Sequence, residues 1–197
     1  MLIIRRGKRE MNKTLKLLIL SDIFVFSGFG LISPILAIFI KDNLVGGTIL
    51  AAGIASAIFL VTHSVLQIIF AYIFNPKDRR WMILIGTFFI AIVPFGYIFS
   101  TNIWHLYLIQ FIYGLGAAFA YPSWASLFTA HLEKGQRGFQ WSIYNSSIGL
   151  GTAVTAWAGA LIAEKIGFHW VFIMTGGFAV LGLIILFFLE KKSLERI

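Results

Sequence analysis

Residues 48–74 read TILAAGIASAIFLVTHSVLQIIFAYIF, a run without a single Asp, Glu, Lys or Arg. The hydrocarbon core of a bilayer is about 30 Å thick, so a helix needs about 20 apolar residues to cross it. This run is long enough, and its apolar residues surround the helix instead of forming the one apolar stripe of a soluble bundle. We therefore interpret it as a membrane span.

Five further apolar runs lie on either side of this one, so that six spans are expected in all. Their bounds are 17–40, 48–74, 82–99, 103–128, 139–163 and 169–189. The chain is 59% hydrophobic and only 12% charged, which leaves too little polar surface for a soluble domain. The sequence predicts an all-α, polytopic membrane protein: a six-helix bundle at 17–189 between a basic tail at 1–16 and a short tail at 190–197.

The Lys and Arg residues are distributed very unequally between the two sides of this arrangement. Fourteen of the sixteen fall in the two tails and in the loops after the second and fourth spans, and only Lys41 and Lys165 fall on the other side. Because positive loops stay in the cytosol, both termini are expected to be cytosolic, and we expect a prokaryotic plasma membrane. The net charge of +8 is spread between spans and forms no basic patch, so the expected partner is the lipid bilayer and no nucleic acid.

Three stretches resemble the signature motifs of the major facilitator superfamily. They are the loop at 71–81 (AYIFNPKDRRW), the fourth span at 110–118 (QFIYGLGAA) and the fifth span at 151–160 (GTAVTAWAGA). Arg79 and Arg80 match the family's loop motif, whereas Asn75 and Asp78 stand where the motif has an acid and a glycine. In the fourth span Gln110 replaces the family's arginine, and in the fifth span the family's Gly-Pro pair is absent.

The resemblance covers about residues 15–190 and implies the six-helix, N-terminal-type half of a twelve-helix transporter. It implies transport of a small organic solute by alternating access, with a homodimer of two such halves rebuilding the pore. Proton coupling is one form of this expectation, and the missing arginine leaves uncoupled facilitated diffusion open. The alternatives are a non-transporting or regulatory subunit that pairs with another half, or the N-terminal fragment of a twelve-helix transporter.

No enzyme, metal site or cofactor is expected from the sequence. There is no cysteine, which excludes thiolate ligands and cysteine nucleophiles. Neither a His-Glu-x-x-His zinc motif nor a Gly-x-Ser-x-Gly elbow occurs, and the four histidines are scattered.

Ionisable side chains inside a membrane are costly, so Asp22 and His63 are candidates for proton coupling. Asp22 shares a helical stripe with Phe26, Phe29 and Ser33, and it is also a candidate ligand for a cationic substrate. The alternatives are a carboxylate held by neighbouring helix ends and a histidine that only hydrogen-bonds between helices.

Candidate cavity residues come from three spans, since the resemblance implies that the first and fourth helices line the central cavity. They are Phe26, Phe29, Ser33, Gln110, Tyr113, Tyr121, Trp124 and Asn145. Aromatic walls with a few polar groups suit organic solutes. The resemblance also assigns gating to the loop residues Asn75, Asp78, Arg79 and Arg80.

Two further patterns concern helix packing. Gly149, Ala153, Ala156 and Ala160 form a small-residue stripe, which favours close contact with another helix. Pro34, Pro94 and Pro122 lie inside spans, where a missing backbone donor permits a kink.

Overall fold

The structure is a computed structural model that describes residues 11–74 and 79–189. Its helices are α1 (Lys13–Ile32), α2 (Leu36–Asn43), α3 (Ile49–Ile73), α4 (Arg79–Ile98), α5 (Ile103–His131), α6 (Arg137–Ile166) and α7 (Phe168–Phe187). Six helices of this described part are long and apolar enough to cross a membrane, and only α2 is short. The prediction of an all-α, six-span membrane protein is confirmed.

Side-chain caps explain where several helices begin. The first N–H groups of a helix have no partner within it, and a preceding Asn or Thr can accept from them. Asn12 accepts from the backbone N–H of Thr14 at 2.9 Å, at the start of α1. Thr48 accepts from Ala51 at 3.0 Å at the start of α3, and Asn102 accepts from two N–H groups at the start of α5.

The first predicted span is not one continuous helix. Residues 17–40 were expected to form a single span, but α1 ends at Ile32 and α2 begins at Leu36, with a turn at 33–35 between them. Pro34 lies in that turn and has no backbone N–H to continue the helical ladder. Pro94 and Pro122, by contrast, lie within the continuous helices α4 and α5.

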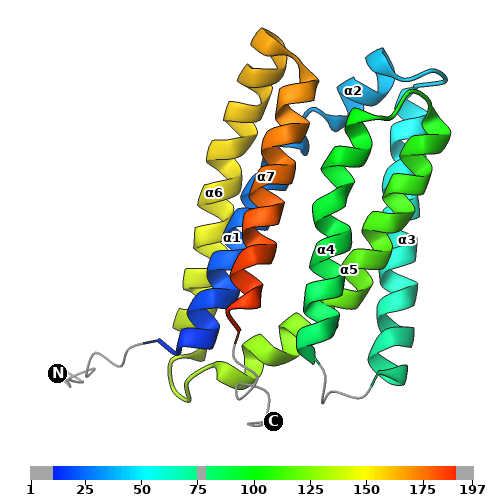
Figure 1. The fold of residues 1–197 in the computed structure, drawn as a ribbon. Helices are drawn as coiled ribbons and strands as arrows, with labels where there is room; N and C mark the ends of the chain where they lie inside the picture. Colours follow the sequence, from blue (N-terminus) through cyan, green and yellow to red (C-terminus); the bar gives the residue numbers. More distant parts are fainter. Residues whose placement is uncertain (1–10, 75–78, 190–197) are drawn as a thin grey trace.

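The spans form two groups of three helices (Figure 1). In one group α1 packs against α6 and α7, and in the other α5 packs against α3 and α4. Contact between α4 and α7 joins the groups, whereas α1 and α5 touch at few positions and α3 and α6 lie at opposite edges of the bundle. The start of α1 and the end of α7 lie at the same end of the molecule, the lower end in Figure 1.

The helix pair α1–α6 shows how glycine permits close approach. A Cβ atom at Gly159 of α6 would collide with the backbone of Leu31 in α1, and one at Gly30 would collide with the hydroxyl of Thr155. The expected small-residue stripe of this helix faces elsewhere: Gly149, Ala153 and Ala160 are exposed, and a Cβ atom at Gly149 would meet nothing within 4 Å. The rotation of α6 therefore leaves most of this stripe exposed, and only Ala156 is half-buried.

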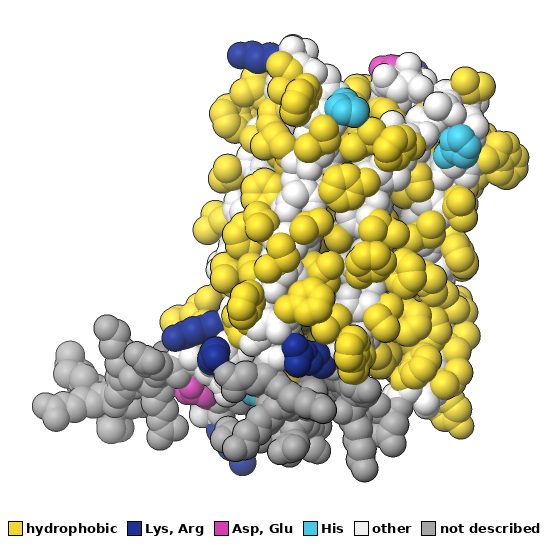
Figure 2. All heavy atoms as spheres, viewed as in Figure 1, with side chains coloured by type: hydrophobic (Ala, Val, Ile, Leu, Met, Phe, Trp, Pro, Cys, Tyr) yellow, Lys and Arg dark blue, Asp and Glu magenta, His cyan; other side chains and the backbone are white. Residues whose placement is uncertain are grey.

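The surface fits a bilayer. Figure 2 shows apolar side chains covering this face between the two ends, with Lys and Arg side chains gathered mainly at the lower end. Large apolar side chains on the outer helices are strongly exposed, for example Ile68 at 70% and Leu150 at 71%. In water such a surface would aggregate, whereas in lipid it needs no cover.

Candidate functional site

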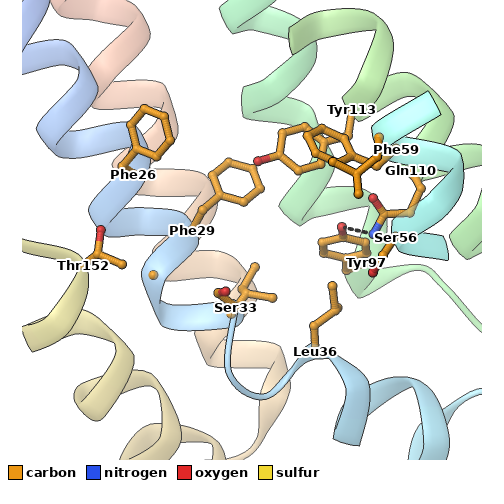
Figure 3. Close-up of a pocket in the computed structure, with 13 residues that line it drawn as sticks. Phe26, Phe29, Ser33, Leu36, Ser56, Phe59, Tyr97, Gln110, Tyr113 and Thr152 are labelled. Atoms are coloured by element: carbon orange, nitrogen blue, oxygen red, sulfur yellow. Dashed lines mark hydrogen bonds between the residues drawn. The ribbon is translucent and has the colours of Figure 1, made fainter. Parts of the chain in front are cut away.

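A partly open cavity of about 410 Å³ lies between the two groups of helices (Figure 3). It sits where α1 and α5 separate, near the upper end of the bundle, and its walls come from α1 to α6. Its lining residues are Phe26, Phe29, Gly30, Ile32, Ser33, Leu36, Ser56, Phe59, Leu60, Tyr97, Gln110, Tyr113 and Thr152.

Stacked aromatic rings connect α1, α5 and α3 across this cavity. Phe29 of α1 and Tyr113 of α5 are stacked with ring centroids 4.8 Å apart, and Phe59 of α3 stacks on Tyr113 at 4.3 Å. Figure 3 shows Phe29 and Tyr113 pointing toward each other between the two groups. Offset stacking of this kind is favourable beyond simple burial, and it presents flat apolar walls to a ligand.

The polar groups of the cavity are neutral. Gln110, whose side chain is only 4% exposed, donates from Nε2 to the hydroxyl of Tyr97 at 3.2 Å. Ser33, Ser56 and Thr152 add hydroxyl groups at other points of the lining. The cavity is thus an aromatic space with a few hydrogen-bonding groups, which is the usual composition of a site for an organic molecule.

Asp22 lies on the same face of α1 as Phe26 and Phe29, toward the lower end. Its Oδ2 accepts a hydrogen bond of 2.9 Å from the hydroxyl of Tyr144 in α6. Tyr144 belongs to an aromatic cluster with Trp124, Phe128 and Trp141, in which its ring lies 4.9 Å from Trp124 and 5.1 Å from Phe128. The carboxylate is therefore fixed between α1 and α6, beside aromatic rings.

The predicted cavity residues divide into two sets. Five of them line the described cavity: Phe26, Phe29, Ser33, Gln110 and Tyr113. Three lie elsewhere: Trp124 is buried in the cluster around Tyr144, Tyr121 is exposed on α5, and Asn145 is exposed on α6.

His63 lies next to this cavity but does not line it. Its ring stacks on Phe59 at 5.9 Å and meets the ring of Tyr121 edge to face at 5.9 Å. Its Nε2 is buried and has no hydrogen-bond partner among the described residues. An aromatic row thus runs from the cavity through His63 to Tyr121.

The predicted gating loop falls mostly outside the described residues. Asn75 and Asp78 lie outside them altogether, and Arg79 is described only as the first backbone position of α4. The guanidinium of Arg80 donates to the carbonyl oxygen of Phe187, the last residue of α7, at 2.8 Å. A cation at this position complements the negative end of the helix dipole and connects α4 to α7 at the lower end.

Several lining residues were not among the predicted ones. Phe59 and Leu60 lie in a span whose apolar residues surround the helix, so nothing in the pattern distinguished them. The lining residue Tyr97 offered a usable signal, as did Tyr144 outside the lining, because a tyrosine inside a membrane needs a partner for its hydroxyl group. Those partners, Gln110 and Asp22, are polar residues in other spans.

Comparison with known proteins gives the same architecture. The family model described as Major Facilitator Superfamily matches residues 18–196. An uncharacterised MFS-type transporter of Methanocaldococcus jannaschii is 28% identical over 158 residues, which are 80% of this chain and 40% of that protein. A multi-drug resistance efflux pump PmrA homolog of Lactococcus lactis is 22% identical over 176 residues, which are 88% of this chain and 43% of that protein.

Among solved structures, the crystal structure of the POT family transporter PepTSo superposes with a TM-score of 0.67 at 16% identity. The match covers 91% of this chain and 37% of that one. Because the sequence identity is low, the likeness is one of fold. The chain spans about two fifths of the length of the curated relatives described above. The match of the family model over nearly all of its length shows that this chain belongs to the Major Facilitator Superfamily.

Proposed function

We propose that this chain carries a small organic solute across the membrane by alternating access, paired with a second six-helix unit that is a second copy of itself. In such a mechanism two bundles rock about a site near the midplane and expose it to one side at a time. The membrane family, the six spans and the aromatic cavity support transport of an organic molecule.

The observation that carries the proposal is the open side of the cavity. On one side α4 and α7 pack together, which closes the gap between the two helix groups. On the other side α3 and α6 stand far apart, and the lining residues Phe26, Ser33, Ser56 and Leu60 are exposed. A half-open cavity with polar groups facing lipid is unfavourable, so a second protein surface is the expected cover.

The two exposed edges of α6 differ in composition. Helical periodicity places Gly149, Ala153 and Ala160 on the edge next to the cavity. The other exposed edge carries the large side chains Leu150 and Val154, about 100° further round the helix, and Trp157 lies between the two edges. Small residues let helix backbones approach closely, whereas lipid chains accept large apolar residues. The edge next to the cavity therefore suits contact with protein, and the other edge suits contact with lipid.

On α3, at the other edge of the bundle, exposed Gly53, Ala57 and Ser64 lie beside the lining residues Ser56 and Leu60. Val61 and Ile68 follow Ala57 and Ser64 by four residues and share their stripe, and Val65 lies further round the helix. The cavity is thus flanked by two edges that suit contact with protein, one on α6 and one on α3. A face of this kind can pair with a copy of itself about a twofold axis along the membrane normal. This axis gives both copies the same orientation in the membrane. That orientation agrees with the unequal distribution of Lys and Arg between the two sides.

Native mass spectrometry of the chain in nanodiscs tests the pairing. We expect a protein component at twice 22.1 kDa. Gly149→Trp places a bulky ring on the cavity-side edge and should give monomers, while Gly149→Ala and the lipid-edge control Val154→Trp should stay dimeric. A monomer for the unchanged chain contradicts self-pairing and favours a different partner half, as expected of a regulatory subunit or of the N-terminal part of a longer transporter.

We also propose cytosolic termini in a prokaryotic plasma membrane, on the basis of the Lys and Arg distribution. Because the chain contains no cysteine, a single introduced one reports its side of the membrane. In intact cells a membrane-impermeant thiol reagent should label Lys165→Cys and should leave Lys134→Cys unlabelled. The reverse pattern would show the opposite orientation.

A further inference from the structure

We infer that the solute bound at this cavity is a lipophilic organic cation, and that the Asp22 carboxylate is its counter-charge. The inference rests on the proposed function, because it names the class of solute that the chain would carry. Three features of the described residues support it: the position of Asp22, its missing counter-ion, and the aromatic cavity walls, which contain no Lys or Arg.

Asp22 is close enough to the cavity to share a ligand with it. Phe26 and Phe29, which line the cavity, follow Asp22 by four and seven residues on the same face of α1. At 1.5 Å per residue these separations are about 6 Å and about 10 Å along the helix axis. A ligand with several aromatic rings spans such distances, so one molecule can touch the cavity rings and the carboxylate.

The hydrogen bonding of Asp22 leaves room for a ligand. Tyr144 donates to Oδ2 and fixes the orientation of the carboxylate. Within the described part of the chain Oδ1 has no hydrogen-bond partner, and Asp22 forms no ion pair. A charged carboxylate in a membrane without a counter-ion is costly, and a bound cation would lower that cost.

The cavity itself favours positive charge. No Lys or Arg is among its lining residues, so nothing there would hold an anion by charge. Phe29 and Phe59 stack on Tyr113, and the ring face of Phe29 turned away from Tyr113 offers the negative side of an aromatic quadrupole, which attracts organic cations. The end of α1 also borders the cavity at Gly30, Ile32 and Ser33, and the carboxyl end of a helix carries partial negative charge.

Two ions of the same shape and opposite charge test this inference directly. Tetraphenylphosphonium and tetraphenylborate each carry four phenyl rings around one charged centre. Equilibrium dialysis against the chain in nanodiscs, with empty nanodiscs subtracted, should show saturable binding of the cation and none of the anion. Equal binding of both ions, or binding of the anion alone, would overturn the inference without requiring any variant.

Variants then locate the site. Asp22→Asn removes the charge at nearly constant size and should weaken tetraphenylphosphonium binding by about tenfold or more. Asp42→Asn removes an equally negative charge from the exposed upper end of α2 and should leave binding unchanged. Asp22→Glu keeps the charge and should retain most of the binding. Unchanged binding in Asp22→Asn would place the cation elsewhere and contradict the assignment.

Failure of this inference is distinguishable from failure of the proposed function. Binding to the purified chain requires neither a dimer nor transport, so it can succeed where native mass spectrometry finds only monomers. Conversely, a dimer whose binding shows no preference for the cation would retain the proposed pairing and lose the assignment of Asp22.

Discussion

The contact between α1 and α6 gives a sharp prediction from two glycines of the same helix. In Gly159→Ala the added methyl group would collide with the carbonyl oxygen, carbonyl carbon and Cα of Leu31. In Gly149→Ala the methyl group would meet nothing within 4 Å. The two substitutions are chemically identical, so a loss of stability confined to Gly159→Ala reports the packing of α1 on α6.

The expected magnitudes follow from two opposing terms. Replacing Gly by Ala inside a helix gains about 1 kcal/mol of helix propensity at either position. Overpacking a close contact costs about 1–3 kcal/mol, and Gly159 should lie at the upper end because a backbone, not a flexible side chain, must move. Gly159→Ala should therefore be destabilising by about 1–2 kcal/mol, and Gly149→Ala should be neutral or stabilising by up to about 1 kcal/mol.

Thermal unfolding in one detergent, followed by circular dichroism, measures both variants beside the unchanged chain. For a chain of this size 1 kcal/mol shifts Tm by about 2–4 °C. We expect Tm to fall by about 2–8 °C in Gly159→Ala, and to stay level or rise by up to about 4 °C in Gly149→Ala. Equal shifts in the two variants, or a higher Tm for Gly159→Ala, would refute the close approach of α1 to α6.

Three further predictions concern single polar side chains. Gln110→Leu leaves the buried Tyr97 hydroxyl without its partner and should lower the free energy of unfolding by about 1–3 kcal/mol. The double variant Gln110→Leu with Tyr97→Phe should recover part of this stability, and a loss equal to the sum of the two single losses would contradict the hydrogen bond. Arg80→Ala removes the donor to Phe187 and should lower Tm more than Arg80→Lys does, and equal Tm values would contradict the role of the guanidinium. Asp22→Asn should abolish proton-driven accumulation of ethidium in cells at unchanged protein level, and full accumulation would exclude Asp22 from coupling.

The spans were predictable from the sequence because the membrane acts on each helix separately. A bilayer requires about 20 apolar residues per crossing. The run at 48–74 and the other five apolar runs each meet this requirement within a continuous stretch of sequence. The starting points of α3 and α5 also depend on local sequence, because Thr48 and Asn102 directly precede these helices and cap them. Stripes of side chains on single helices likewise placed Phe29 and Gln110 among the cavity candidates.

Contacts between distant segments were beyond such reasoning. The chain turns at Pro34 but passes through Pro94 and Pro122 as helix, although all three lack the same donor. Similarly, Gly159 packs against α1 while Gly149 is exposed on the same helix. Helix rotation is set by the neighbours of all six spans together, and sequence periodicity describes each helix only about its own axis. For this reason the placement of Trp124 in a buried cluster, away from the cavity, became visible only in the folded bundle.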